Sequence, residues 1–235
     1  MEYPLLNYLR ALPKSLYFNL RYLPFSQAIR LPILLYKAEF VALKGRVSID
    51  APQIRFGMIK LGFRNVPLFP NTGIVFENRG GDVIFSGEAS IGNASALSIG
   101  AEAGLYFGAD FSATALKVVA FEYIVFADRV RIGWDCLVTD TDFHTLTRDD
   151  GTHTRGHAAT LISEDTWIGM RCTLLKGTIL PPQTVVSAHS KLTGRYDIPP
   201  RSLLSGNPAT LIKTGIYRNM SDDAITYQSP ALTDE

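Results

Sequence analysis

An aliphatic residue occupies every sixth position of the chain, without a slip, from residue 162 to residue 204. The eight positions are Ile162, Ile168, Leu174, Leu180, Val186, Leu192, Ile198 and Leu204. Four residues after most of them stands a small or β-branched residue, namely Thr166, Cys172, Thr178, Thr184, Ser190 and Ser202, with Tyr196 as the departure. A period of six fits neither the 3.6 of an α-helix nor the 2 of an alternating strand. It predicts a solenoid in which each hexapeptide is a short strand plus a turn.

Three such strands close one triangular coil, and the stacked coils bury a continuous column of aliphatic side chains. The small residue is needed because the corner of the triangle has no room for a large inward side chain. Weaker traces of the same register lie upstream: Phe126, Ile132 and Val138; Phe85, Ile91 and Leu97; Ile99, Leu105 and Phe111. Cys136 and Cys172 fall at the small positions, so we interpret both as inward fillers rather than ligands or nucleophiles.

The chain divides into three parts by composition. Residues 1–46 carry Pro4, Pro13, Pro24 and Pro32 between apolar and aromatic runs, which predicts short, broken helices. Residues 47–213 are the predicted solenoid, interrupted near 112–123 and more sharply at 144–160. Residues 214–235 are a tail, of which the last ten or so are expected to be weakly ordered.

Composition excludes several classes of protein. Hydrophobic residues make up 46% and charged residues 19%, so the chain can bury a core. A net charge of +1 gives no reason to expect a nucleic-acid partner. Two cysteines make no disulfide framework. The sequence has no run of about 18 apolar residues, the length that a helix needs to span a bilayer. Without a signal-peptide pattern at the N-terminus, we expect a cytoplasmic protein.

Several short motifs accompany the repeat. They are Trp167-Ile168-Gly169, Lys176-Gly177-Thr178, Asp197-Ile198-Pro199-Pro200 and Ser205-Gly206-Asn207-Pro208-Ala209. With these motifs the repeat region resembles the left-handed β-helix (hexapeptide-repeat) acyltransferase superfamily, and especially its maltose/galactoside and surface-polysaccharide O-acetyltransferase branches. The resemblance implies an all-β, left-handed parallel β-helix, a handedness that the period alone does not set. It also implies a homotrimer with active sites at the subunit interfaces, acetyl-CoA as co-substrate and a sugar or glycan as acceptor.

His144 is the predicted general base. It ends the segment Val138-Thr139-Asp140-Thr141-Asp142-Phe143-His144, at the end of a coil and the start of the longest interruption, where the family keeps its catalytic histidine. A sugar hydroxyl is a poor nucleophile, and an imidazole can remove its proton during attack on a thioester. Asp142, Asp140 or a backbone carbonyl could orient the ring, and Asp142 shares a strand face with His144.

The other histidines receive a simpler interpretation. His153, His157 and His189 are expected to be surface residues. A metal site built from His144, His153 and His157 would require a ligand pattern like that of the β-helical carbonic anhydrases, which the segment RDDGTHTRGH does not contain. We therefore expect no metal.

The resemblance also implies a set of acetyl-CoA contacts. Backbone groups of Met170, Ala188 and Thr193 would meet the pantetheine arm, and Trp167 would pack beside His144 and the thiol end. Lys213 would lie near the phosphates. Where the family commonly has Thr-Lys, this chain has Thr193 followed by Gly194-Arg195, so Arg195 is a candidate substitute for that lysine.

The basic and aromatic opening segment leaves two interpretations. It would cap the first coil, or it would lie on an anionic membrane through residues 10–37, at the inner face of the membrane. The function remains open in the same way: O-acetylation of a sugar in surface-polysaccharide biosynthesis, transfer to another small molecule (amino sugar, serine or antibiotic), or a catalytically silent binding scaffold.

Overall fold

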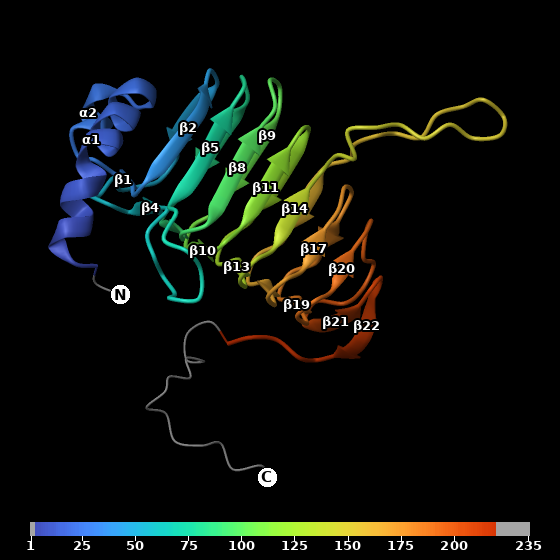
Figure 1. The fold of residues 1–235 in the computed structure, drawn as a ribbon. Helices are drawn as coiled ribbons and strands as arrows, with labels where there is room; N and C mark the ends of the chain where they lie inside the picture. The colour runs from blue at the N-terminus through green and yellow to red at the C-terminus, as the bar shows by residue number, and fades with distance from the viewer. Residues whose placement is uncertain (1–2, 220–235) are drawn as a thin grey trace, which may run out of the picture.

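Each turn of the chain contributes one short strand to each of three parallel sheets, as seen in a computed structural model that describes residues 3–219 (Figure 1). Sheet A comprises β1 (Ile33–Leu35), β4 (Ile59–Leu61), β7 (Ala89–Ile91), β10 (Phe111–Ala113), β13 (Arg131–Ile132), β16 (Trp167–Ile168), β19 (Val185–Val186), β21 (Ser202–Gly206) and β22 (Ala209–Thr214). Sheet B comprises β2 (Ala38–Leu43), β5 (Ile74–Asn78), β8 (Ser95–Ile99), β11 (Lys117–Ala120), β14 (Leu137–Thr139), β17 (Thr173–Leu174) and β20 (Lys191–Leu192). Sheet C comprises β3 (Arg46–Ile49), β6 (Asp82–Phe85), β9 (Gly104–Phe107), β12 (Tyr123–Phe126), β15 (Thr160–Ile162) and β18 (Ile179–Leu180).

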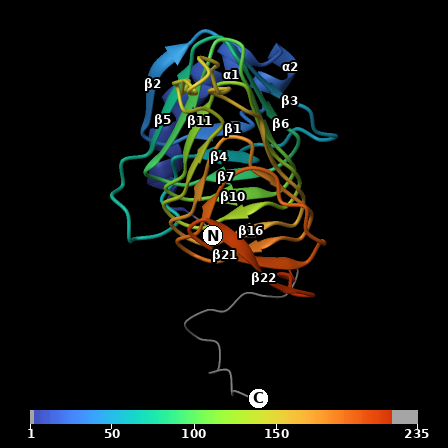
Figure 2. The ribbon, with the colours of Figure 1, turned by 90° about the vertical axis from the view of Figure 1, so that its right-hand side faces the viewer.

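The coils wind in the left-handed sense. The chain runs up sheet B on the near side of Figure 1, crosses the top and returns through sheet C on the far side. In Figure 2, the two sheets lie on opposite sides of the coil. Because the N-terminal coils are on the left of Figure 1, this path advances as a left-handed helix. The fold is therefore the parallel β-helix that the six-residue period predicts, with the left-handed sense that the family resemblance implies.

The hexapeptide positions point to the axis as predicted. Seven of the eight aliphatic residues between 162 and 204 are almost fully buried, and Ile198 packs against them from a partly buried position. The small residues at the corners are also buried, including both cysteines. Contact with Cys172 and burial raise the pKa of the Cys136 thiol, which keeps it in the inert, protonated form of a packing residue.

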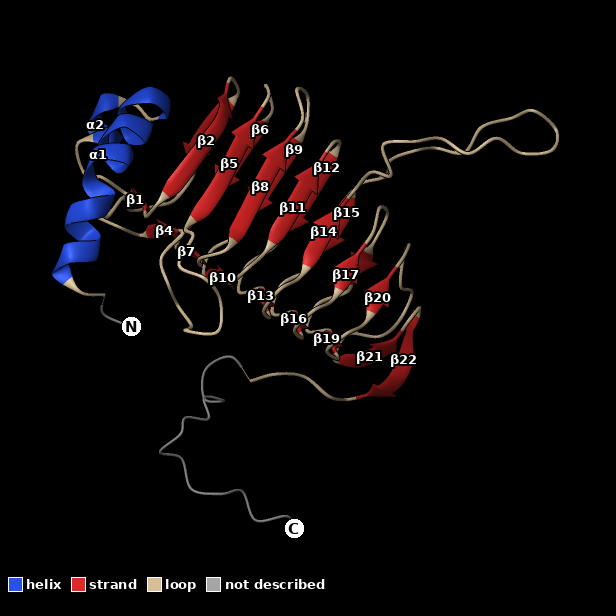
Figure 3. Cartoon of the chain, in the orientation of Figure 1, coloured by secondary structure: helices blue, strands red, loops and turns tan. Residues whose placement is uncertain are grey.

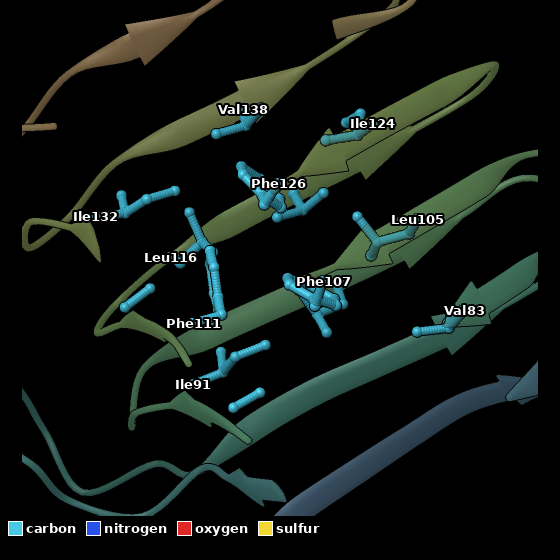
Figure 4. Packing of buried hydrophobic residues seen from close by; sticks show 14 of the residues in the cluster. Val83, Ile91, Leu105, Phe107, Phe111, Leu116, Ile124, Phe126, Ile132 and Val138 are labelled. Carbon is cyan, nitrogen blue, oxygen red and sulfur yellow. The ribbon is translucent and has the colours of Figure 1, made fainter. Parts of the chain in front are cut away.

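The wider, earlier coils fill their axis with aromatic rings. Phe85, Phe107 and Phe126 occupy matching positions of sheet C, and their ring centroids are 5.0 and 5.5 Å apart from one coil to the next. Phe111 packs against this ladder from sheet A (Figure 4). Stacked rings of this kind fill the larger cross-section of a coil whose strands are longer.

The apparent slip of the repeat before residue 100 has a simple cause. Leu97 and Ile99 both point inward from the same five-residue strand, β8. Ile74 pairs with Ser95, 21 residues later, whereas Thr173 pairs with Lys191, 18 residues later. Longer strands therefore add residues to the early coils. The predicted interruption at 112–123 is wrong, because β10, β11 and β12 continue the coils there. A loop at 62–73, between β4 and β5, was not predicted.

The β-helix begins at Ile33 rather than at residue 47, because β1 and β2 already pair with the next coil. Before it lie α1 (Leu5–Tyr22) and α2 (Phe25–Ala28), which cover the open end of the first coil (Figure 3). Ser15 Oγ accepts the N–H of Leu35, and the Asn19 side chain bonds both the N–H and the C=O of Ile33. Polar residues of α1 thus satisfy the free edge of β1, which would otherwise be open to pairing with another chain.

At the other end, β22 turns back antiparallel to β21 and closes sheet A. The tail predicted for 214–235 begins after this strand, and its last residues lie outside the described range. No helix in the part of the chain that the structure describes is long and apolar enough to cross a membrane.

Candidate functional site

The long interruption forms a hairpin arm, residues 141–157, that leaves the β-helix between sheets B and C and projects away from it (Figure 1). We call the corner between these sheets the B–C edge. Antiparallel bridges join Thr141 to His157 and Thr147 to His153. The N–H of Asp142 donates to the C=O of Gly156 at 2.8 Å. The arm is therefore a two-stranded element with its own hydrogen bonds.

His144 lies near the base of this arm and is exposed to solvent. Its ring has no hydrogen-bond partner among residues 3–219. The preceding residue, Phe143, has a φ of 56°, in the left-handed region that a bulky side chain rarely adopts. Its N–H is held by Thr141 Oγ1 at 2.9 Å, and its ring meets Phe121 edge-on at 6.3 Å. Local contacts thus fix the backbone that presents His144.

Lys176, on the next coil, anchors the arm. Its Nζ lies 2.6 Å from Oδ2 of Asp142 and donates to the C=O of Arg155 at 2.7 Å. One ammonium group therefore holds both strands of the arm. Asp142, one of the candidate orienting partners of His144, is directed to Lys176 instead.

Asp140, the other candidate partner of His144, points into the β-helix. It is fully buried and accepts the N–H groups of Phe121 and Glu122 at 2.7 and 2.8 Å. Burial raises the pKa of this carboxyl, partly offset by those bonds. Asp140 therefore shapes the neighbouring turn, and neither carboxylate of the DTD segment contacts the His144 ring.

Glu122 is a functional candidate that sequence reasoning missed. Its carboxylate lies 2.7 Å from His157 Nδ1 and 2.8 Å from Arg155, and the His157 ring packs 5.1 Å from that of Phe121. His157, interpreted as a simple surface residue, is thus a carboxylate-bound imidazole at the base of the arm. The partners are 35 residues apart, and only the stacking of coils joins them.

The predicted acetyl-CoA contacts do not converge within one chain. Thr193 and Arg195 follow β20 on the B–C edge, the edge that carries His144, and Arg195 pairs with Asp197 at 2.8 Å. Met170 and Ala188 lie on the corner between sheets A and B, the A–B edge.

Trp167 and Lys213 belong to sheet A. Trp167 starts β16, with its ring under the Arg218 guanidinium at 5.2 Å, and is not beside His144, because β16 and the arm lie on opposite sides of the β-helix (Figure 1). Lys213 is exposed on β22 and makes no ion pair within the described range. A single chain therefore presents separate parts of the predicted site on separate surfaces.

Large apolar side chains are exposed at two of these edges. The B–C patch comprises Phe121, Tyr123, Phe143, Leu146 and Leu161, which are 37–67% exposed. The A–B patch comprises Trp134, Leu137 and Met170, which are 36–44% exposed. Exposed apolar patches of this kind mark contact surfaces.

Two cavities of the described part of the chain lie elsewhere. One, of about 360 Å³, lies along sheet A and is lined by residues that include Lys60, Glu88 and Arg131. Another, of about 290 Å³, lies beside Tyr217 and Arg218. His144 lines neither, so its surroundings are open in one chain. No cluster of three or more metal-ligating side chains occurs in residues 3–219.

The geometry defines a hexapeptide-repeat, left-handed β-helix with a histidine-bearing arm. No protein-family model matches the sequence, and no curated protein matches it. Among solved structures, the chain is similar to the polySia-specific acetyltransferase NeuO, with 18% identity, 80% of this chain and 84% of that chain covered, and a TM-score of 0.49.

Two further solved structures are also acetyltransferases. The polysialic acid O-acetyltransferase OatWY is 17% identical over 79% of this chain and 74% of its own, with a TM-score of 0.38. A hexapeptide-repeat acetyltransferase from Vibrio cholerae, solved with acetyl-CoA, is 14% identical over 89% of this chain and 87% of its own, also with a TM-score of 0.38. The fold assignment of the present chain rests on its own strand order and register.

Proposed function

We propose that this chain is an acetyl-CoA-dependent O-acetyltransferase that modifies a sugar hydroxyl, with His144 as general base. The observation that carries the proposal is the position of His144. It stands exposed at the base of an arm that Lys176 ties to the β-helix, with an apolar patch around it. A solvent-facing imidazole on a fixed backbone, ready to be covered by another surface, is suited to general-base work.

The proposed reaction needs no covalent enzyme intermediate. The imidazole of His144 takes the proton of the acceptor hydroxyl as its oxygen attacks the thioester carbonyl carbon. The tetrahedral intermediate collapses with cleavage of the C–S bond, and the imidazolium returns the proton to the CoA thiolate. The products are an acetyl ester and free CoA. A backbone N–H at the site would stabilise the oxyanion.

We further propose that the enzyme is a homotrimer in which each site is shared. The B–C edge of one protomer would contribute His144, Thr193 and Arg195, and the A–B edge of the next would contribute Met170 and Ala188. This arrangement buries the two apolar patches against each other and would cover the open surroundings of His144.

Acetyl-CoA suits the surfaces available. Gly169 and Ala188 stack so closely that a Cβ on Gly169 would lie 2.5 Å from the Ala188 nitrogen, so glycine lets the coils stack at this edge. Met170 and Ala188 are exposed there, so their backbone groups could meet a pantetheine chain. Lys213 supplies an exposed cation for a phosphate, and Arg195 could do so on release from Asp197. Trp167 would stack on the ligand from sheet A.

An acceptor in surface-polysaccharide biosynthesis, at the cytoplasmic face of the membrane, is the most specific form of the proposal. The names of the two polysialic acid enzymes agree with a glycan acceptor. The rival functions are transfer to an amine or another small molecule, and a silent scaffold.

Calorimetric titration with acetyl-CoA, followed by a thiol-release assay over a panel of sugars, amino sugars and serine, tests the proposal. We expect micromolar binding and thiol release that depends on a sugar. Release with only an amine or serine would reassign the acceptor, whereas no acetyl-CoA binding at millimolar concentration would leave the scaffold as the function.

A second test uses the glycine opposite His144 in the arm. A Cβ at Gly156 would lie 2.8 Å from the His144 carbonyl oxygen, too close without a backbone shift. We expect Gly156→Ala to lower kcat by about ten- to hundredfold, because roughly 1 Å of misplacement has effects of that size. Steady-state kinetics would measure it. Gly151→Ala at the tip is the control: its φ of 81° strains an alanine, but a Cβ there meets nothing within 4 Å, so backbone strain remote from His144 should leave kcat within about twofold. Equal kinetics for both variants and wild type would contradict the role of His144.

A further inference from the structure

The helix that caps the β-helix has two unlike faces. Its inner face carries Ser15, Phe18 and Asn19, which are fully buried, and Phe18 packs edge-on against Phe76 of β5 at 5.2 Å. This face accounts for capping. Capping does not account for the residues on the opposite side of α1.

The outer face of α1 is a stripe of leucines. Leu5, Leu9, Leu16 and Leu20 fall within roughly 60° of one another at about 100° per residue of an α-helix. They are 74%, 53%, 48% and 50% exposed. Ordinary surface helices place polar residues there, so a continuous apolar stripe of this kind marks a contact surface.

Positive charge accompanies the stripe. Arg10, Lys14 and Arg21 lie together on the flank of α1 next to β2, where Lys14 donates to the C=O of Ala38 and Arg21 to the C=O of Leu43. Neither α1 nor α2 contains an acidic residue. After α1, Phe25 and Ile29 are 72% and 59% exposed and are followed by Arg30. Between residues 3 and 46 the structure has seven basic side chains and one acidic side chain, Glu39. We call this leucine stripe, with its basic flank and the exposed residues of 25–30, the end face.

The orientation of α1 makes the end face accessible as a whole. α1 lies across the N-terminal end of the β-helix, at the left of Figure 1, so its outer side faces away from the coils. The arm of residues 141–157 and the A–B and B–C patches lie along the sides of the β-helix. A protein could therefore use its sides for self-assembly and leave the end face free.

Charge distinguishes between two candidate partners of the end face, a second copy of the chain and an anionic membrane. A second copy joined end to end would bring two basic flanks together, and like charges across an interface oppose association. An anionic bilayer surface attracts the cations and accepts the leucines among its headgroups and upper acyl chains. We propose that the end face docks the protein on an anionic membrane surface, with α1 in the plane of the interface. The inference rests on the end face alone and is independent of the proposed chemistry.

The test compares two triple variants of the full chain in vesicle co-sedimentation. The end-face variant changes exposed leucines of the stripe: Leu9→Gln, Leu16→Gln and Leu20→Gln. The control variant changes similarly exposed aliphatic residues outside α1: Leu68→Gln, Leu211→Gln and Ile212→Gln, which are 67%, 43% and 58% exposed in the native chain. Neither set belongs to the buried core, and circular dichroism checks that both variants keep the native spectrum.

Wild type and the control variant should bind vesicles of phosphatidylglycerol and phosphatidylcholine in equal parts at 50 mM salt. The end-face variant should bind at least about tenfold more weakly, since three apolar side chains no longer enter the interface. Binding should fall at 0.5 M salt and be absent on pure phosphatidylcholine vesicles, because the cations then lack partners.

Three results would overturn the proposal: no binding of wild type to anionic vesicles, equal loss of binding in both variants, or binding indifferent to lipid charge. Light scattering provides the remaining check. If wild type is twice the mass of the end-face variant, the surface belongs to a second copy of the chain and not to lipid.

Discussion

The His144→Ala enzyme should lose about 10² to 10⁴ in kcat while its affinity for acetyl-CoA stays within about twofold of wild type, the range typical of a lost general base. The side chain is exposed and has no hydrogen-bond partner in the described chain, so its removal leaves the fold intact. Only the proton-transfer contribution is removed. Single-turnover kinetics with the acceptor that the panel assay selects would measure the chemical step directly.

His157 provides the matched control for this experiment. It is the other imidazole at the base of the arm, but Glu122 holds it at 2.7 Å. His157→Ala should loosen the arm and lower kcat less, by about tenfold, since it acts through position rather than proton transfer. If His157→Ala lost as much as expected for His144→Ala, and His144→Ala kept more than about a third of the rate, the base would be His157.

Two inactive variants should restore activity when they are mixed, if the active site is shared between protomers. His144→Ala removes the base from the B–C edge. Ala188→Trp adds bulk to the exposed A–B edge, where the pantetheine chain is expected, without touching the core. Each homotrimer should be inactive.

In mixed trimers, a site is intact when the protomer giving His144 is native at that position and its neighbour is native at Ala188. With equal amounts of both chains the chance is one half for each, so about a quarter of the sites should be intact. Unfolding and refolding the two variants together, and then measuring thiol release, gives this fraction. Light scattering before mixing should show one species of three times 25.9 kDa.

Failure of the mixture to exceed either parent, with trimers present, would place the whole site within one chain. A monomeric species at micromolar concentration would contradict the shared site from the start. The separation of Met170 and Ala188 from His144 on two edges would then need another explanation.

The repeat could be predicted from the sequence because its information is local. Each unit of six residues consists of a two-residue strand and a turn, and the next unit repeats it. The aliphatic residue of each unit, such as Leu174 or Leu180, points to the axis of the β-helix. The prediction weakens where strands are longer. Leu97 and Ile99 both enter the axis from β8, so the period changes without any change of fold. The start at Ile33 was missed for the same reason: β2 has six residues and carries no hexapeptide pattern.

The contacts of the candidate site could not be predicted in this way. Asp142 and His144 share a strand face in the sequence, which suggested a pair, but Lys176 on the next coil competes for the carboxylate with a full charge 2.6 Å away. No sequence pattern links Glu122 to His157, because the residues of the arm separate them along the chain although their coils are adjacent in space. In the sequence, Ser15 and Asn19 resemble ordinary polar residues of a helix. Only the structure shows that they bond to the free edge of β1.

By itself, the sequence determined that this chain is a hexapeptide-repeat β-helix, that its cysteines pack inward and that His144 stands where the coil gives way to a long insertion. These features depend on residues close along the chain. The tertiary structure alone decided that Lys176 and Glu122 anchor the arm, that the predicted acetyl-CoA contacts lie on separate edges, and that α1 carries leucines outward. Those features depend on which coils stack and which faces remain uncovered. The packing of the whole chain sets these contacts, and no local sequence pattern does.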